Sequence, residues 1–284
     1  MNVTIGRTRF LRGIAAPVLV AALMIAPALP SAADDRDWND KGSVHSNVDF
    51  RWHGRIAAGK VIEVKGVNGG IHVEPTSGSE VEVQAKKTWR RSDPDEVKIE
   101  VIQHEDGVTI CAVYPTPSGE RPNDCTPGET SHSHTSNNDV QVDYTVRAPA
   151  GVRFIGRTVN GGIDARGLTA DAEAYTVNGS IDLATRGSAQ ASTVNGSIDV
   201  VMGRGLDESL EFATVNGGIT VSMPANASAD VKASTTNGSI DTDFPITVRG
   251  KFSRRHLSGT IGRGGPGLSL TTINGDIRLR SSSL

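Results

Sequence analysis

Apolar and polar residues alternate with a period of two along most of the chain. Ala172 and Ala174 flank Glu173, and Ala189 and Ala191 flank Gln190. This alternation is typical of a strand with one buried face, whereas an amphipathic helix would show a period of 3.6 residues. No stretch with the helical period stands out, so the pattern predicts an all-β protein.

The predicted strands are organised by a repeated Asn-Gly dipeptide. The heptapeptide TVNGSID occurs at 176–182 and again at 193–199, and the first copy of the repeat centres on Asn68. From residue 160 onward, successive Asn residues are 18, 17, 21, 21 and 37 positions apart; they are Asn160, Asn178, Asn195, Asn216, Asn237 and Asn274. The last step is close to two periods, so we expect a degenerate copy at 257–265. A period near 20 residues indicates a repeat architecture.

Each repeat contains a strand, an Asn-Gly corner and a second strand with an inward Ile. Two folds fit this order. Consecutive hairpins would form a β-sandwich, since Asn-Gly is the preferred pair of a type I′ turn. Alternatively, each repeat is one coil of about 20 residues in a β-solenoid. Small inward residues favour the solenoid, whose stacked coils lie ~4.8 Å apart and place equal residues in ladders. We expect one such ladder of coil-to-coil bonded hydroxyls from Thr158, Thr176, Thr193, Thr214, Thr235 and Thr272.

The chain divides into three parts. Residues 1–33 have a basic start, a short apolar run and small residues before Asp34, as in a secretory signal peptide. Residues 34–47 are polar, and we expect them to be disordered. Residues 48–284 form the predicted β-solenoid domain, with further strands near 80–89, 96–103 and 107–115 and a long polar loop at 115–139. No later segment is apolar enough for a transmembrane helix.

Charge and cysteine content limit the binding partners and the compartment that we expect for the mature chain. Signal cleavage removes three of the 29 basic residues and none of the 32 acidic ones, so nothing favours binding to nucleic acid. Cys111 and Cys125 are the two cysteines. In an exported protein they are expected to form a disulfide. The alternative is a metal or redox site, although their spacing is not CxxC.

The series EVKGVNGGIHVEP, EVEVQAKK, DPDEVKIEV and GVTICAVYP, followed by TVNG(G/S)ID repeats and GPGLSLTTINGDIRLR, resembles a bacterial family. It is the putative-adhesin family of exported β-strand-repeat domains, a class of unknown function. The resemblance covers roughly residues 48–284. It implies a single-stranded, right-handed β-helix outside the cytoplasm, with no established catalytic residues. We expect no cofactor.

One outward column carries the candidate chemistry. After each inward Ile stands an acidic residue in four of the copies: Asp164, Asp182, Asp199 and Asp241. Like charges so close repel one another and call for compensation. The compensation is a solvated face with Arg and Lys partners, or bound calcium, or the paired acids of a polysaccharide-cleaving enzyme. The sequence contains no calcium-binding glycine nonapeptide, HExxH motif, nucleophile elbow, phosphate-binding loop or dinucleotide fingerprint.

These observations favour an exported, non-catalytic β-repeat scaffold that binds a surface glycan or another envelope component, in the periplasm or at the cell surface. The alternative is a carbohydrate-active β-helix enzyme that uses the Asp column. Two outward Asp side chains that share a groove and a basic residue would favour the enzyme.

Overall fold

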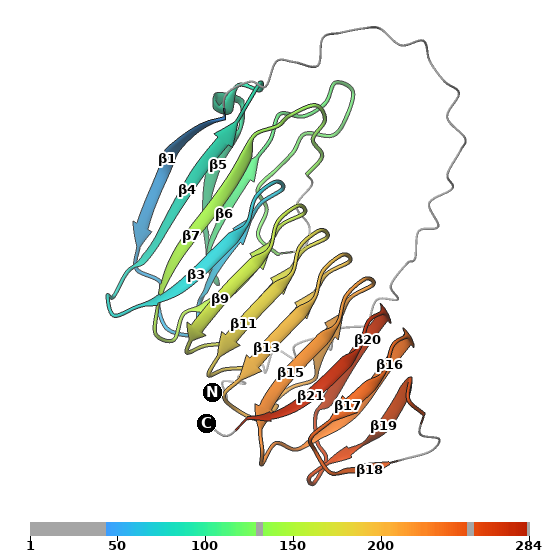
Figure 1. The fold of residues 1–284 in the computed structure, drawn as a ribbon. Coiled ribbons are helices and arrows are strands. Elements are labelled where there is room, and N and C mark those ends of the chain that lie inside the picture. Colours follow the sequence, from blue (N-terminus) through green and yellow to red (C-terminus); the bar gives the residue numbers. More distant parts are fainter. Residues whose placement is uncertain (1–43, 129–132, 249–252, 283–284) are drawn as a thin grey trace, which may run out of the picture. The chain divides into compact units, whose positions relative to one another are not determined.

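The computed structural model describes residues 44–128, 133–248 and 253–282, and the expected signal peptide lies outside them. These residues form two long sheets and one 3-10 turn, η1 (Pro94–Glu96) (Figure 1). In spatial order, sheet A contains β1 (His45–Gly54), β4 (Val81–Trp89), β7 (Gln141–Pro149), β3 (Ile71–Thr76), β9 (Ile163–Leu168), β11 (Ile181–Thr185), β13 (Ile198–Met202), β15 (Ile219–Pro224), β21 (Ile277–Ser282) and β17 (Ile240–Thr242). Sheet B contains β18 (Ile246–Val248), β19 (His256–Ile261), β16 (Ala229–Asn237), β20 (Gly267–Asn274), β14 (Leu210–Ala213), β12 (Ala189–Ser192), β10 (Ala172–Tyr175), β8 (Arg153–Arg157), β2 (Val61–Lys65), β6 (Gly107–Val113) and β5 (Lys98–His104).

Each central repeat contributes one strand to each sheet, and equivalent strands pair in parallel. Ile181 on β11 is the register partner of Ile198 on β13, and Ala174 on β10 is the partner of Ala191 on β12. A hairpin would instead pair the two strands of one repeat in antiparallel fashion. The prediction of an all-β solenoid is therefore confirmed, and the alternative of consecutive hairpins is wrong.

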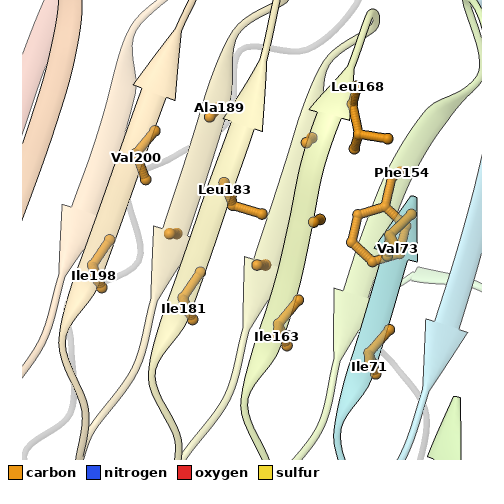
Figure 2. Close-up of a cluster of buried hydrophobic side chains, with 14 of the residues drawn as sticks. Ile71, Val73, Phe154, Ile163, Leu168, Ile181, Leu183, Ala189, Ile198 and Val200 are labelled. Atoms are coloured by element: carbon orange, nitrogen blue, oxygen red, sulfur yellow. The ribbon is translucent and has the colours of Figure 1, made fainter. Parts of the chain in front are cut away.

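The core lies between the two sheets and is narrow. Figure 2 shows Ile163, Ile181 and Ile198 at equivalent places on neighbouring strands of sheet A, and each is 1 % exposed. In the facing strands of sheet B, Ala174 and Ala191 are fully buried. In these coils, large residues on sheet A thus oppose small residues on sheet B, which suits close packing of the two sheets.

The Asn-Gly dipeptides lie at the corners between the sheets, and stacking explains their glycines. Of the seven, only Gly69 has a positive φ, so a type I′ turn is not the reason. A Cβ on Gly179 would overlap the carbonyl oxygen of Gly161, and a Cβ on Gly196 would overlap that of Gly179. Glycine is needed because the backbone of the neighbouring coil passes directly against the corner.

The threonine before each corner fastens one coil to the next. Thr158 Oγ1 donates to the Gly69 carbonyl and Thr176 Oγ1 to the Gly161 carbonyl, both over 2.9 Å. The hydroxyls therefore bond to the neighbouring backbone and not to one another. This arrangement satisfies a buried hydroxyl and a corner carbonyl together.

The last coil in the sequence is not the last coil in space. Leu268 on β20 pairs in parallel with Leu210 on β14 and with Val231 on β16, so β20 lies between these two strands. In sheet A, β21 likewise lies between β15 and β17. The expected degenerate copy at 257–265 is wrong: β19 covers this region and runs antiparallel to β16. The long step from Asn237 to Asn274 is this antiparallel excursion.

Antiparallel strands flank the stacked coils. Sheet A continues past β7 into β4 and β1, and sheet B continues past β6 into β5. Residues 34–43 of the segment that we expected to be disordered lie outside the described residues, and the end of that segment is ordered, because His45 already belongs to β1. Polar side chains suggested disorder there, but the strand is held by its backbone pairing to β4 and by stacking of His45 on Trp89.

The predicted disulfide is confirmed, since Cys111 and Cys125 are bonded with Cα atoms 5.6 Å apart. Cys111 belongs to β6, and Cys125 lies in the long connection to β7. The described parts of this connection, 115–128 and 133–139, contain no strand. Within the described ranges, no helix is long and apolar enough to cross a membrane.

Candidate binding face

The corner of each coil presents its polar residues on one surface, which we call the corner face. It consists of four columns, of which the Val and Asn columns run through most coils and the Ser and Asp columns through three coils each. The Val and Asn columns come before the corner glycine, and the Ser and Asp columns follow it. The members of the corner face are Val159, Val177, Val194, Val215 and Ile273; Asn160, Asn178, Asn195, Asn216, Asn274 and Asn237; Ser180, Ser197 and Ser239; and Asp164, Asp182 and Asp199. Val159, Val177, Val194 and Ile273 are each 36–39 % exposed.

The asparagine side chains form a continuous hydrogen-bonded ladder. Asn178 Nδ2 donates to Asn160 Oδ1 over 2.8 Å, and Asn195 Nδ2 donates to Asn178 Oδ1 over 2.7 Å. The other rungs run from Asn160 to Asn68, Asn216 to Asn195, Asn274 to Asn216 and Asn237 to Asn274, over 2.7–2.9 Å. The sequence placed these residues at corners but did not reveal the ladder. A sign of the ladder was available, because identical Asn residues in parallel, in-register coils become neighbours.

The ladder leaves hydrogen-bonding capacity on the surface. A carboxamide has two N–H donors and two acceptor lone pairs. An inner rung uses one donor and one acceptor, so a second donor and a second acceptor remain. Because adjacent coils lie ~4.8 Å apart, these groups repeat at that spacing along the face.

The Asp column is only partly continuous. Asp164, Asp182 and Asp199 are register partners on β9, β11 and β13. The next partners are Thr220 on β15 and Arg278 on β21, and Asp241 follows on β17. The structure therefore brings the first three carboxylates together and leaves Asp241 apart.

Arginines compensate part of this charge. The Arg166 guanidinium lies 3.3 Å from Asp164 and also contacts Asp182. Asp241 is paired with Arg280 at 2.9 Å. Asp199 forms no ion pair or hydrogen bond with any described residue. Partial burial and, secondarily, the charge of Asp182 raise the pKa of Asp199 above its ordinary value, and Arg166 opposes this shift.

A shallow groove lies at one end of the column. His72, Asp143, Asp164 and Asp182 contribute to its lining. Two outward Asp residues thus share a groove, and both contact Arg166. In the ranges the structure describes, no three His, Cys, Asp or Glu side chains gather as a set of metal ligands.

A second charged cluster lies under the connection that carries Cys125, and the sequence did not indicate it. Glu63 and Lys65 project from the outer side of β2 but are only 2 % and 9 % exposed. Glu63 accepts hydrogen bonds from Thr109 Oγ1 and from the Gly128 backbone, over 2.9 and 3.0 Å. Burial lowers the pKa of Lys65, and the charge of Glu63 opposes this. A sign of this cluster was available: Glu63 and Lys65 are charged residues of β2, a strand whose residues are all buried.

Lys65 also donates to the Thr126 carbonyl over 2.6 Å. The cluster therefore holds the connection against sheet B, next to the disulfide. We assign it a structural role, because buried charges need such partners.

Comparison with protein families gives one match. The model of the family described as Toastrack DUF4097 matches residues 56–280, which is most of the chain. No curated protein matches the chain.

Several solved structures are similar at low sequence identity. A "putative cell adhesion protein" from Clostridium sporogenes is 10 % identical, with a TM-score of 0.41, over 85 % of this chain and 100 % of that one. A "putative adhesin" from Bacteroides fragilis is 10 % identical, with a TM-score of 0.32, over 84 % of this chain and 97 % of that one. A "putative adhesin" from Parabacteroides distasonis is 11 % identical, with a TM-score of 0.27, over 84 % and 98 % of the two chains.

Proposed function

The chain belongs to the Toastrack DUF4097 family, and from this premise we propose that it is an exported, non-catalytic scaffold whose corner face binds an envelope polysaccharide. The observation that carries the proposal is the in-register set of columns. Exposed Val and Asn side chains and partly exposed or exposed Asp side chains recur once per coil on three consecutive coils, which begin their corners at Val159, Val177 and Val194.

The chemistry of these columns suits a hydroxyl-rich polymer. Amides and carboxylates hydrogen-bond to hydroxyl groups, and each inner Asn keeps one donor and one acceptor for this purpose. The neighbouring Val column offers apolar contact to C–H surfaces, as binding sites commonly do. A ligand with repeating units can use several coils at once, so weak contacts add up.

Export is part of the proposal. The first 33 residues have the pattern of a signal peptide. The disulfide between Cys111 and Cys125 is of a kind that persists in oxidising compartments and is rare in the cytosol. Both observations support a location in the periplasm or at the cell surface.

The test is binding of the purified mature chain to a panel of soluble and insoluble envelope polysaccharides. Asp182→Ala/Asp199→Ala should weaken binding about tenfold or more. Glu208→Ala/Glu211→Ala is the matched control, because it removes the same charge from β14 of sheet B and the loop before it. Thermal unfolding of each variant monitors the fold. Equal binding by both folded double variants would remove the Asp column from the proposed site.

A carbohydrate-active enzyme is the second candidate, and two observations favour it. Asp164 and Asp182 share a groove and both contact Arg166, which is the arrangement that favours the enzyme. Asp182 is paired with Arg166, while its register partner Asp199 has a raised pKa. Retaining glycosidases also use two carboxyl groups whose environments push their pKa values apart. Release of reducing ends from the panel by the wild type, but not by Asp199→Asn, would establish this enzyme and overturn the non-catalytic proposal.

A further inference from the structure

The Asn-Gly dipeptide has a chemical reactivity that goes beyond its role at the corners. Glycine has no side chain, so its backbone nitrogen can readily approach the side-chain carbonyl carbon of the preceding Asn. Attack closes a succinimide ring and releases ammonia. The attack requires a glycine N–H that is not held in a hydrogen bond and an Asn side chain that can turn. The structure shows how far each of the seven sites meets these conditions.

Six of the seven sites are held by the next coil. Gly161 N donates to the Asn178 carbonyl, and Gly179 N donates to the Asn195 carbonyl, both over 3.0 Å. The same bond joins Gly69 to Asn160, Gly196 to Asn216, Gly217 to Asn274 and Gly275 to Asn237, over 2.8–3.0 Å. At every inner site the Asn side chain is also bonded on both sides within the ladder. Stacking of the coils therefore suppresses succinimide formation at these six Asn-Gly sites, although their sequence favours it.

The seventh site, Asn237-Gly238, lies on the last coil of the stack in space. The Gly238 N–H has no hydrogen-bond partner among the described residues. The Asn237 side chain is bonded on one side only, to Asn274. Arg254 and Arg255 contact this coil on both sides of its corner. Thr235 N donates to the Arg255 carbonyl, and Ile240 N donates to the Arg254 carbonyl. Asn237 itself stays exposed.

We propose that Asn237-Gly238 is a site of spontaneous deamidation in the folded protein. The Gly238 nitrogen forms a bond to Asn237 Cγ, the bond from Cγ to Nδ2 breaks, and ammonia leaves with the proton of the Gly238 N–H. Water then opens the ring and yields Asp or isoAsp at position 237. The net reaction consumes one water, releases one ammonia and needs no oxidant.

The modification spreads along the stack in a defined direction. IsoAsp lengthens the backbone at residue 237, and an Asp carboxylate cannot donate to Asn274 Oδ1. Both products weaken the coil that holds the Gly275 N–H through the Asn237 carbonyl. Asn274-Gly275 then becomes the exposed site, and Asn216-Gly217 follows it. The order is the order of coils in space, which differs from the order in the sequence.

The test is peptide mass spectrometry of the mature chain with its disulfide intact, incubated at mildly alkaline pH. Asn237 should deamidate about tenfold faster than any site from Asn160 to Asn216, since one backbone hydrogen bond and one side-chain tether are missing. In denaturant all seven sites should react at similar rates. Reaction at Asn237 no faster than at the inner sites of the folded chain would overturn the proposal.

Two variants test the direction. Asn237→Asp imitates the product and should accelerate deamidation at Asn274. Asn68→Asp is the matched control at the other end of the ladder. No corner glycine depends on this residue, because the Asn68 carbonyl accepts from Val142 N, whereas the Asn237 carbonyl accepts from Gly275 N. Equal rates at Asn274 in both variants would contradict directional spreading.

Discussion

At the scale of residues, the corner glycine decides whether the coils can stack. The backbone of the neighbouring coil occupies the place where a side chain would be. The Cβ of an Ala at position 196 would overlap the Gly179 carbonyl oxygen. The coil would have to separate from its neighbour to accommodate it, which breaks the hydrogen bonds between them. The sequence shows that glycine recurs, but a recurring glycine also fits a type I′ turn. Only the stacking geometry distinguishes the two reasons.

We therefore expect Gly196→Ala to lower the free energy of unfolding by about 3 kcal/mol or more, as for overpacked sites. Gly205→Ala is the matched control, since a Cβ there meets no atom within 4 Å. It should be neutral or slightly stabilising. Urea denaturation of both variants measures the difference. Equal stability would show that the coils do not approach as closely as described.

Asp199 is a second residue whose environment gives a prediction. Its raised pKa means that ionisation of Asp199 disfavours the folded state. The penalty is absent below the pKa of the unfolded chain, about 3.9. It develops as the pH rises from that value to the higher pKa of the folded chain, and it is complete above the folded pKa. Because solvent screens this exposed carboxylate, Asp199→Asn should increase stability at pH 7 by no more than a few tenths of a kcal/mol.

The same substitution should give no gain near pH 3. Thermal unfolding at the two pH values measures the effect, with Asp241→Asn as control because Asp241 is paired with Arg280. A gain of the same size at both pH values would rule out the electrostatic explanation.

At the scale of elements, strands and coils could be predicted from the sequence, and the ladder could not. Period-two alternation identifies a strand from its own residues, as in β10 and β12. The Asn ladder depends on which residues become neighbours, and thus on the parallel register. The strand β1 was missed for a related reason, since its order comes from pairing with β4 and not from its own composition.

The ladder predicts unequal effects of two identical substitutions. Asn195→Ala removes two side-chain hydrogen bonds, to Asn178 and from Asn216, whereas Asn237→Ala removes one. With a net value of about 1 kcal/mol for each bond, the first variant should lose about twice the stability of the second. Chemical denaturation compares them. Equal losses would show that the side chains act separately and not as a ladder.

At the scale of the whole molecule, the position of the last coil is the feature that the sequence could least reveal. The copies around Asn216, Asn237 and Asn274 present similar inward residues, so each could stack on another. The chain leaves one coil position open after β15 and fills it later with β20 and β21. This requires the excursion through β18 and β19, which the regular period concealed.

The central claim is that equivalent residues of stacked coils are neighbours in this spatial order, and paired cysteines test it directly. Thr271 is the register partner of both Ala213 and Ser234. Adjacent strands lie ~4.8 Å apart, within the range that a disulfide spans. Under mild oxidation, Ala213→Cys/Thr271→Cys and Ser234→Cys/Thr271→Cys should cross-link within one chain. Ala213→Cys/Ser234→Cys should not, because β20 lies between these strands. A cross-link in the third variant, without one in the first two, would contradict the arrangement on which the corner face depends.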